Sequence, residues 1–401
     1  MAATALILAT PARQRMTVLA ISAAFFSLSN CAFDMIAPLW ATGDLGFTAA
    51  EWAYLRSLRF TGTFVGILAF GILAERLGSR RTAALTLALG GCAMSLMALG
   101  TPWLVTLSMP LFGALVSTTF VHFNALTQQV SPQRQSLANG IYRGIGAGMA
   151  IIAPILATTA AQRLGAWSPV LQLAAFATAA GGVIILLYPE QEHNAAQSFA
   201  AVWRGFATAA RKRALWRFIY LDQAMAFTQG AVVAFSAVRL TRELGLSEPG
   251  FGIVCTVGAS LGLVSVLLAG VLFQRFPLNW GMSAAWLGSA VGSLLLGLSD
   301  SLAINIIGVL LVAMFWPVTS VPGSMWIGVA GGATATAFTV HKIVQSGVAA
   351  VTMVLVGWLE PRLGMQPLLL IGGIIGLPLT ALMFYSMRDP RGTTERNHPS
   401  L

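Results

Sequence analysis

Charged side chains are scarce in this chain of 401 residues, since Asp, Glu, Lys and Arg together make up only 9%. A water-soluble protein of this length needs far more charge to cover its surface. Apolar residues make up 57%, and apolar runs of about 20 residues, the length of a helix that crosses a bilayer, recur throughout. The composition therefore predicts an all-α membrane protein and excludes a soluble globular one.

Cysteine and histidine are rare as well. The three cysteines lie in apolar runs and the four histidines are scattered, so we expect neither a disulfide framework nor a metal site. No glycine-rich loop followed by Lys-Ser or Lys-Thr is present, so ATP hydrolysis is not expected. We expect no enzyme activity and no cofactor. The net charge of +10 comes from short loop clusters rather than from a basic domain, which argues against a nucleic-acid partner.

The apolar runs predict twelve membrane spans, with the first retained as a span rather than cleaved as a signal peptide. If the N-terminus is cytoplasmic, most loop arginines fall inside and only Arg163, Arg239, Arg242 and Arg362 fall outside. This asymmetry predicts a multi-pass inner (plasma) membrane protein with both termini in the cytoplasm. The predicted spans are 17–39, 50–72, 82–100, 103–125, 138–160, 169–188, 215–238, 250–273, 281–299, 303–324, 335–358 and 367–387.

One long connection, residues 189–214, divides the chain. Within it, Phe199, Trp203 and Phe206 recur at helical spacing beside basic residues, which predicts an amphipathic helix on the inner membrane surface. A plain polar linker is the alternative. The predicted domains are a six-helix bundle over 1–188, the linker 189–214, a second six-helix bundle over 215–387 and a cytoplasmic tail, 388–401.

The two halves repeat each other at a constant offset of 199 residues. Residues 44–48 match 243–247, Gly71 matches Gly270, and residues 163–165 match 362–364. Each match falls at the same topological place in its half. The repeat predicts two pseudo-symmetric bundles, the architecture in which a substrate site lies near the middle of the membrane.

Residues 71–81 read Gly-Ile-Leu-Ala-Glu-Arg-Leu-Gly-Ser-Arg-Arg and connect the second and third predicted spans. This segment resembles the signature loop of the major facilitator superfamily, although Glu75 stands where an aspartate is usual and Ser79 where an arginine is usual. The resemblance implies a secondary transporter that works by alternating access, commonly as a monomer. It also implies a conformational latch between the halves, for which the alternative is a topogenic basic loop only. The latch residues are Gly71, Glu75, Arg76, Gly78, Arg80 and Arg81.

Ionisable residues inside spans are functional candidates, because a charge at mid-bilayer costs several kcal/mol unless it faces a partner or a cavity. They are Asp34, Arg56, Arg59, Arg143, Asp222 and Lys342. We expect Asp34 to pair with Arg59 or Arg56. The pair is either structural or a titratable carboxylate whose proton competes with arginine or substrate. Asp222 is the second candidate proton carrier.

The offset of 199 also relates two pairs of candidate substrate-binding residues. Arg143 and Lys342 are expected to contact an anionic substrate; otherwise they snorkel or close the inner gate. Asn30 and Gln229 fall near the middle of spans that line the cavity in the resembling family. They are expected to offer amide groups to the solute, with hydrogen bonds between helices as the alternative.

These features predict a transporter whose partners are a small polar solute, the lipid bilayer and a proton gradient. An organic anion is favoured because four of the six ionisable residues in the spans are basic, and export is slightly favoured over import on loose resemblance to efflux-type members. One alternative is a proton–drug antiporter, against which Met109 stands where such proteins carry an arginine. Others are a non-transporting membrane receptor or assembly factor and, more remotely, an intramembrane enzyme.

Overall fold

Helices form nearly the whole of the structure, a computed structural model that describes residues 10–130, 135–189, 207–208, 211–273, 276–331 and 335–387. The chain divides into two compact units. Unit 1 comprises Met1–Thr48 and Leu55–Ser198, and unit 2 comprises Ala49–Tyr54 and Phe199–Leu401. The boundary at residue 198 falls inside the predicted linker, whose proposed amphipathic helix lies outside the described residues.

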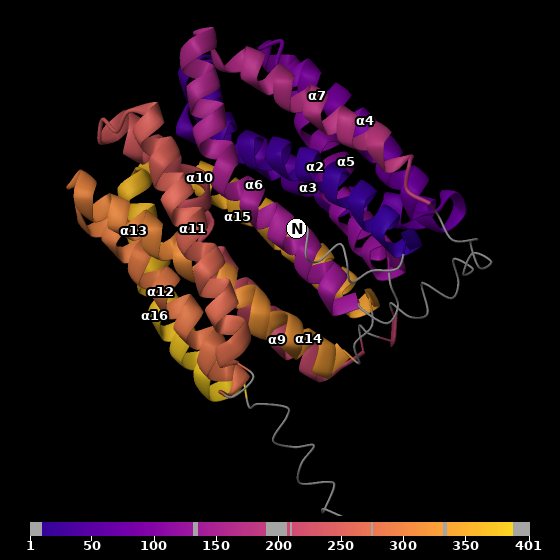
Figure 1. Ribbon diagram of the computed structural model, residues 1–401. Coiled ribbons are helices and arrows are strands. Elements are labelled where there is room, and N and C mark those ends of the chain that lie inside the picture. Colours follow the sequence, from indigo (N-terminus) through magenta and orange to yellow (C-terminus); the bar gives the residue numbers. More distant parts are fainter. Residues whose placement is uncertain are drawn as a thin grey trace, which may run out of the picture. The chain divides into compact units, whose positions relative to one another are not determined.

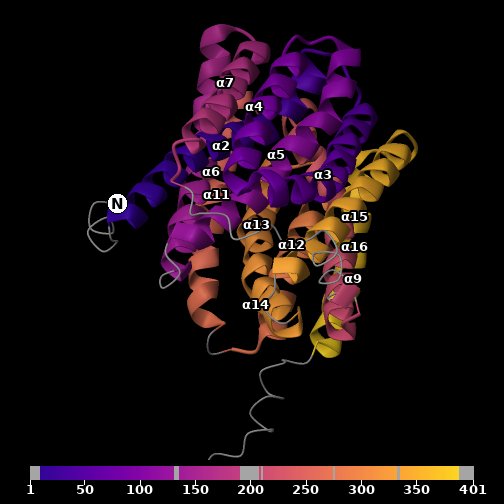
Figure 2. The same ribbon diagram turned by 90° about the vertical axis from the view of Figure 1, so that its right-hand side faces the viewer.

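Six helices account for the first half of the chain (Figure 1). Each covers one of the first six predicted spans. Helices α4 and α7 run side by side within unit 1 in both perpendicular views (Figure 1, Figure 2). The helices are α2 (Thr10–Gly43), α3 (Ala49–Leu77), α4 (Ser79–Met97), α5 (Pro102–Val130), α6 (Gln135–Leu164) and α7 (Trp167–Ile185).

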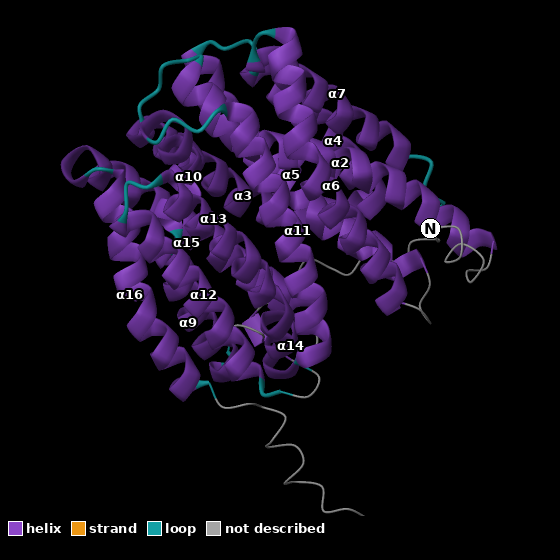
Figure 3. Cartoon of the chain, turned by 60° about the vertical axis from the view of Figure 1, so that its left-hand side comes forward, coloured by secondary structure: helices purple, strands orange, loops and turns teal. Residues whose placement is uncertain are grey.

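The second half adds six further helical segments, two of which are divided. The described residues therefore contain twelve helical segments and no strand, which confirms the predicted fold class (Figure 3). Ten of the segments are long and apolar enough to cross a membrane. The segments of this half are α9 (Arg213–Thr228) with α10 (Gly230–Val238) and a π-helical turn (Arg239–Glu243), α11 (Glu248–Leu272), α12 (Leu278–Leu298), α13 (Leu302–Phe315) with a 3₁₀ turn (Trp316–Thr319) and α14 (Ser320–Gly331), α15 (Ala335–Leu363) and α16 (Met365–Ser386).

Two predicted spans are not the continuous helices that hydropathy indicates. Span seven is interrupted at Gln229, which has φ −89° and ψ 0° between α9 and α10. Span ten is interrupted by the 3₁₀ turn that contains Pro317, a residue that has no backbone N–H to continue an α-helix. Hydropathy does not detect such breaks because the apolar character continues through both of them.

The loops show the internal repeat directly. Gly46 and Gly245 lie at equivalent places with φ of +69° and +71°, and Gly165 and Gly364 have φ of +71° and +81°. After Gly46 and Gly245, the amide of the next residue donates to the carbonyl oxygen six positions back, at 2.9 Å in each unit. Glycine adopts this left-handed backbone region without strain. The weak sequence matches at an offset of 199 therefore mark the same turns.

Glycines hold α3 against α5 in unit 1. A Cβ atom at Gly62 would lie 1.9 Å from the carbonyl oxygen of Pro110, and one at Gly66 would lie 2.3 Å from that of Ala114. Conversely, a Cβ at Gly113 of α5 would lie 2.0 Å from the carbonyl oxygen of Arg59. Small residues permit such backbone contact in membrane helix packing. This contact fixes the position of Arg59.

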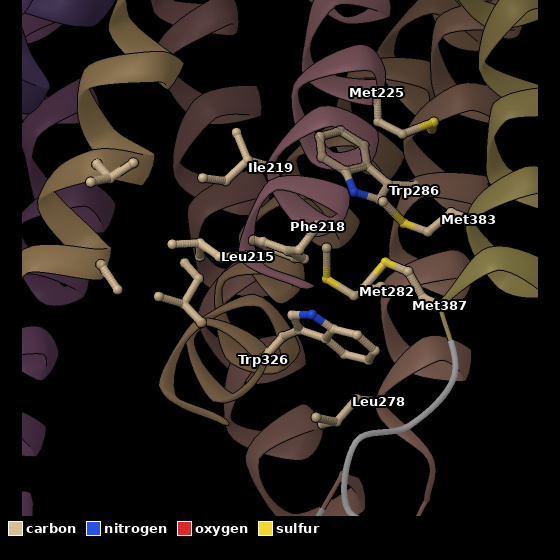
Figure 4. Packing of buried hydrophobic residues seen from close by; sticks show 13 residues of the cluster. Leu215, Phe218, Ile219, Met225, Leu278, Met282, Trp286, Trp326, Met383 and Met387 are labelled. Carbon is tan, nitrogen blue, oxygen red and sulfur yellow. The ribbon is translucent and has the colours of Figure 1, made fainter. Parts of the chain in front are cut away.

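The core of unit 2 is rich in methionine and tryptophan. Phe218 and Met225 of α9 pack there with Met282 and Trp286 of α12 and with Trp326 of α14 (Figure 4). Further apolar side chains come from α15 and α16. The cluster holds α9 in place from several sides.

We predict that Gly113→Ala destabilises the protein, because the added methyl group must push α3 and α5 apart. Overpacking of this kind costs about 1–3 kcal/mol, which thermal unfolding in detergent would detect as a lower Tm. Gly148→Ala in α6 is the matched control, since a Cβ there meets nothing within 4 Å. Equal Tm values for the two variants would contradict the close packing of α3 on α5.

Candidate functional site

An ion pair inside unit 1 joins Asp34 of α2 to Arg59 of α3, as the sequence predicts. Arg59 Nη1 contacts Asp34 Oδ1, and Arg59 Nη2 donates to Asn30 Oδ1 at 3.2 Å. Asn30 Nδ2 in turn donates to Asp34 Oδ2 at 3.2 Å. Asn30 and Asp34 are four positions apart, so one face of α2 presents both side chains. The three residues form a closed hydrogen-bonded triangle, here called the Asp34–Arg59 site.

Two phenylalanine rings hold the guanidinium of Arg59. Its Cζ lies 5.2 Å from the ring centroids of Phe33 and Phe112, a distance at which the ring faces attract a cation. Arg59 is 9% exposed, whereas the side chain of Asp34 is 40% exposed. The cation is therefore fixed and the carboxylate is accessible. Arg56, the other predicted partner of Asp34, lies with its Cζ 5.9 Å from the ring of Phe60.

A second polar cluster lies in unit 2, where Asp222 and Gln223 of α9 meet His341 of α15. His341 Nε2 lies 2.9 Å from Asp222 Oδ2, and Gln223 Nε2 donates to the same oxygen at 2.8 Å. The side chains of Asp222 and His341 are 10% and 12% exposed. The ring of Phe218 packs on the imidazole. Trp326 stacks on Phe218 (Figure 4). We call these three polar residues the Asp222–His341 site.

The other predicted substrate-binding residues lie outside both sites. Arg143 is exposed, and Lys342 is exposed with its Nζ donating to Gln345 Oε1 at 2.7 Å. Gln229 is fully buried at the break between α9 and α10, and its Oε1 has no hydrogen-bond partner among the described residues. The role of each in substrate binding stays a prediction.

The predicted latch segment is only partly defined. Gly71, Glu75 and Arg76 lie in α3, where the structure describes their backbone but not the side chains of Glu75 and Arg76. Gly78 makes the turn into α4 with φ +83°. Arg80 Nη1 donates to the carbonyl oxygen of Tyr188 at 3.0 Å within unit 1.

Tyr188 lies three residues beyond the end of α7, so this contact ties Arg80 to the turn that follows that helix. Arg81 is exposed. The described contact of Arg80 thus lies inside one half of the chain, and a latching role between the halves stays a prediction.

Sequence reasoning placed Arg239 in an outer loop and missed its network. Arg239 is 2% exposed, and its Nη1 donates to Glu243 Oε2 at 2.6 Å. Its Nη2 donates to Asp300 Oδ1 at 3.0 Å and to the carbonyl oxygen of Ser299 at 3.1 Å, while Nε donates to Asn305 Oδ1 at 3.2 Å. The spacing of Arg239 and Glu243 by four residues was the available signal. The network ties the end of α10 to the turn between α12 and α13.

Sequence reasoning also missed His341 as the partner of Asp222, and nothing in the local sequence signals a contact across 119 residues. Among the residues that the structure describes, no group of three or more His, Cys, Asp or Glu side chains could hold a metal ion.

The ten long apolar helices are those of a multi-pass membrane protein, and a comparison with known protein families identifies its class. The chain belongs to the Major Facilitator Superfamily, whose family model matches residues 18–340. The resemblance seen in the signature loop is thereby confirmed. A comparison with curated protein sequences gives no significant match.

Solved structures of transporters share the fold. The nucleoside transporter NupG is 13% identical with a TM-score of 0.76, and the match covers 93% of this chain and 100% of that one. A POT family transporter in complex with 5-aminolevulinic acid is 14% identical with a TM-score of 0.74, covering 94% and 96% of the two chains. At these identities the likeness shows the fold alone.

We predict that Arg239→Met lowers the thermal stability of unit 2, because Asn305 and the backbone of Ser299 lose a buried donor. The cost should be about 2 kcal/mol, since Glu243 and Asp300 are partly exposed and can be hydrated instead. Arg242→Met is the control, because Arg242 makes only an exposed pair with a carboxylate 3.8 Å away. A Tm loss as large in the control would contradict a specific role for Arg239.

Proposed function

We propose that this protein is a secondary active transporter that moves a small polar solute, with an organic anion favoured, by alternating access driven by a proton gradient. Membership of the superfamily and the helical fold support the general class. The finer proposal rests mainly on the Asp34–Arg59 site, a buried cation whose partner carboxylate remains accessible.

The geometry of that site favours an anionic solute. A guanidinium stays charged at all accessible pH and binds planar carboxylates through two hydrogen bonds. Asp34 supplies such a carboxylate now, and a solute that carries one can take its place on Arg59. Asn30, which already donates to Asp34, would offer its amide to the same ligand. Exchange of one carboxylate for another keeps the buried cation neutralised throughout.

The balance of charge within the spans supports the same solute class. Among residues at least five positions from a span end, four Arg and Lys residues, including Arg143 and Lys342, stand against two aspartates. A charge inside a membrane is expensive unless it is compensated. A solute that carries a negative charge reduces the excess, whereas a lipophilic cation would add to it.

Thermal stabilisation by a panel of solutes tests the substrate class. Lactate, succinate and benzoate should raise the Tm of the purified protein, because a ligand that binds only the folded state stabilises it by mass action. Arg59→Ala should remove the effect, and Arg242→Met should keep it. Stabilisation by lipophilic cations alone would instead favour the proton–drug antiporter and overturn the proposal.

Uptake into proteoliposomes tests the transport cycle and its driving force. The anion that stabilises best should accumulate when a pH gradient is imposed across the vesicle membrane, and a proton ionophore should abolish the accumulation. Binding without any uptake or exchange would show a receptor rather than a transporter. Uptake that ignores the pH gradient would contradict proton coupling.

A further inference from the structure

The carboxylates of the two polar sites have partners of different chemistry. Asp34 faces Arg59, whose guanidinium does not lose its proton in proteins. Asp222 faces His341, whose imidazole is the side chain that changes charge between about pH 5 and 8. Arginine has no proton to exchange with its partner, whereas histidine does. Of these two sites, the Asp222–His341 site is the one that combines a buried carboxylate with a partner that can gain or lose a proton.

The hydrogen bonds of His341 determine which of its atoms exchanges the proton. Nε2 lies 2.9 Å from Asp222 Oδ2 and 3.4 Å from Gln223 Nε2. When Asp222 is a carboxylate its oxygens only accept hydrogen bonds, and the shorter contact then requires hydrogen on Nε2. Gln223 Nε2 donates to the same oxygen. Because the bond made by one ring nitrogen sets the state of the other, Nδ1 is left as the atom that is protonated or bare.

Few other ionisable groups surround this site. On α9 itself, Arg213, Arg217 and Tyr220 are exposed, and on α15 the neighbouring Lys342 is exposed and bonded to a glutamine. The helices α10, α12 and α14 carry no titratable side chain, and the only one on α16, Tyr385, is 79% exposed. Within unit 2, Asp222 is therefore the ionisable group that contacts His341.

The internal repeat indicates that the two sites do different work. At an offset of 199 residues, Asp222 and His341 correspond to Ala23 and Tyr142 in the first half. Asp34 and Arg59 correspond to Val233 and Gly258 in the second half. If both sites had the same function, the repeat would place similar ionisable residues at equivalent positions. Instead, the residues equivalent to each site in the other half do not titrate near neutrality.

We infer that the proton that drives transport binds His341 at Nδ1, with Asp222 as the residue that orients the ring and balances its charge. The Asp34–Arg59 site then contacts the solute and carries no transported proton. Proton binding converts the imidazole to an imidazolium that pairs with the Asp222 carboxylate, and proton release restores the neutral ring. This inference rests on the proposed function, since it assigns the proton site of that transporter.

Nitrogen-15 NMR of histidine-labelled full-length protein tests the proton site without any ligand. The chain has four histidines, and His341→Gln identifies the relevant signals. We expect Nε2 of His341 to stay protonated while Nδ1 titrates between about pH 5 and 8. In Asp222→Asn, the preference for hydrogen on Nε2 should be lost. A neutral ring protonated at Nδ1, or a ring whose charge is constant over this range, would overturn the inference.

Transport measurements with lactate, succinate and benzoate test whether the Asp222–His341 site binds the proton while the Asp34–Arg59 site binds the solute. Asp222→Asn and His341→Gln should lose accumulation driven by a pH gradient, by about 10-fold or more, yet keep anion-induced stabilisation and solute exchange without a gradient. Asp44→Asn is the control, because its amide oxygen can still accept from the Trp167 amide as the carboxylate does. Wild-type accumulation in both variants, or loss of exchange together with accumulation, would overturn the inference.

The proposed function and the proton site at His341 can be contradicted separately. If no anion stabilises or crosses the membrane with the wild-type protein, the proposed function fails, and the NMR titration alone then decides whether Nδ1 of His341 binds a proton. If anions are transported and the gradient drives them in both Asp222→Asn and His341→Gln as in the wild type, only the assignment of the proton site fails.

Discussion

The need to neutralise charge locally inside a bilayer governs the functional part of this structure. An isolated ion in hydrocarbon costs several kcal/mol, so each buried ion needs a partner of opposite sign or a route to water. Arg59 has Asp34, His341 has Asp222, and Arg239 has Glu243 and Asp300. Each set lies within one unit.

Side-chain and backbone packing holds Arg59 and His341 beside their carboxylate partners. The glycine contacts between α3 and α5 fix the backbone of Arg59, and two phenylalanine rings hold its guanidinium. In unit 2 the aromatic and methionine core around Phe218 supports the imidazole of His341. This side-chain packing holds each cation at a fixed position, where a carboxylate can bind it. The partner carboxylate Asp34 is left partly accessible, which is what an exchangeable ligand requires.

The sequence predicts the helices well because the length of an apolar run is set by the bilayer and is visible along the chain. It also predicts that Asp34 pairs with Arg59 or Arg56, since residue spacing places them at comparable depth on neighbouring spans, and the structure shows the pair with Arg59. Contacts between distant spans are different. The pairing of Asp222 with His341 depends on how α9 meets α15, and the sequence carries no periodic trace of it.

Local signals also proved incomplete in the second half of the chain. The break at Gln229 depends on backbone conformation rather than hydropathy, so the apolar pattern hides it. The repeat pointed to Arg143 and Lys342, but the structure leaves both exposed. Of their chain neighbours, Tyr142 is buried and the side chain of His341 is 12% exposed. An internal repeat preserves the turns more faithfully than the ionisable side chains.

In the proposed cycle a solute anion replaces Asp34 on Arg59. The Kd of a stabilising anion for the Asp34→Asn variant tests this exchange most directly. Removing the competing carboxylate should tighten binding by about 10-fold or more, equivalent to about 1.4 kcal/mol, because the solute no longer displaces a resident charge. Binding that is weaker than in the wild-type protein, as expected if Asp34 itself held a cationic solute, would contradict the account.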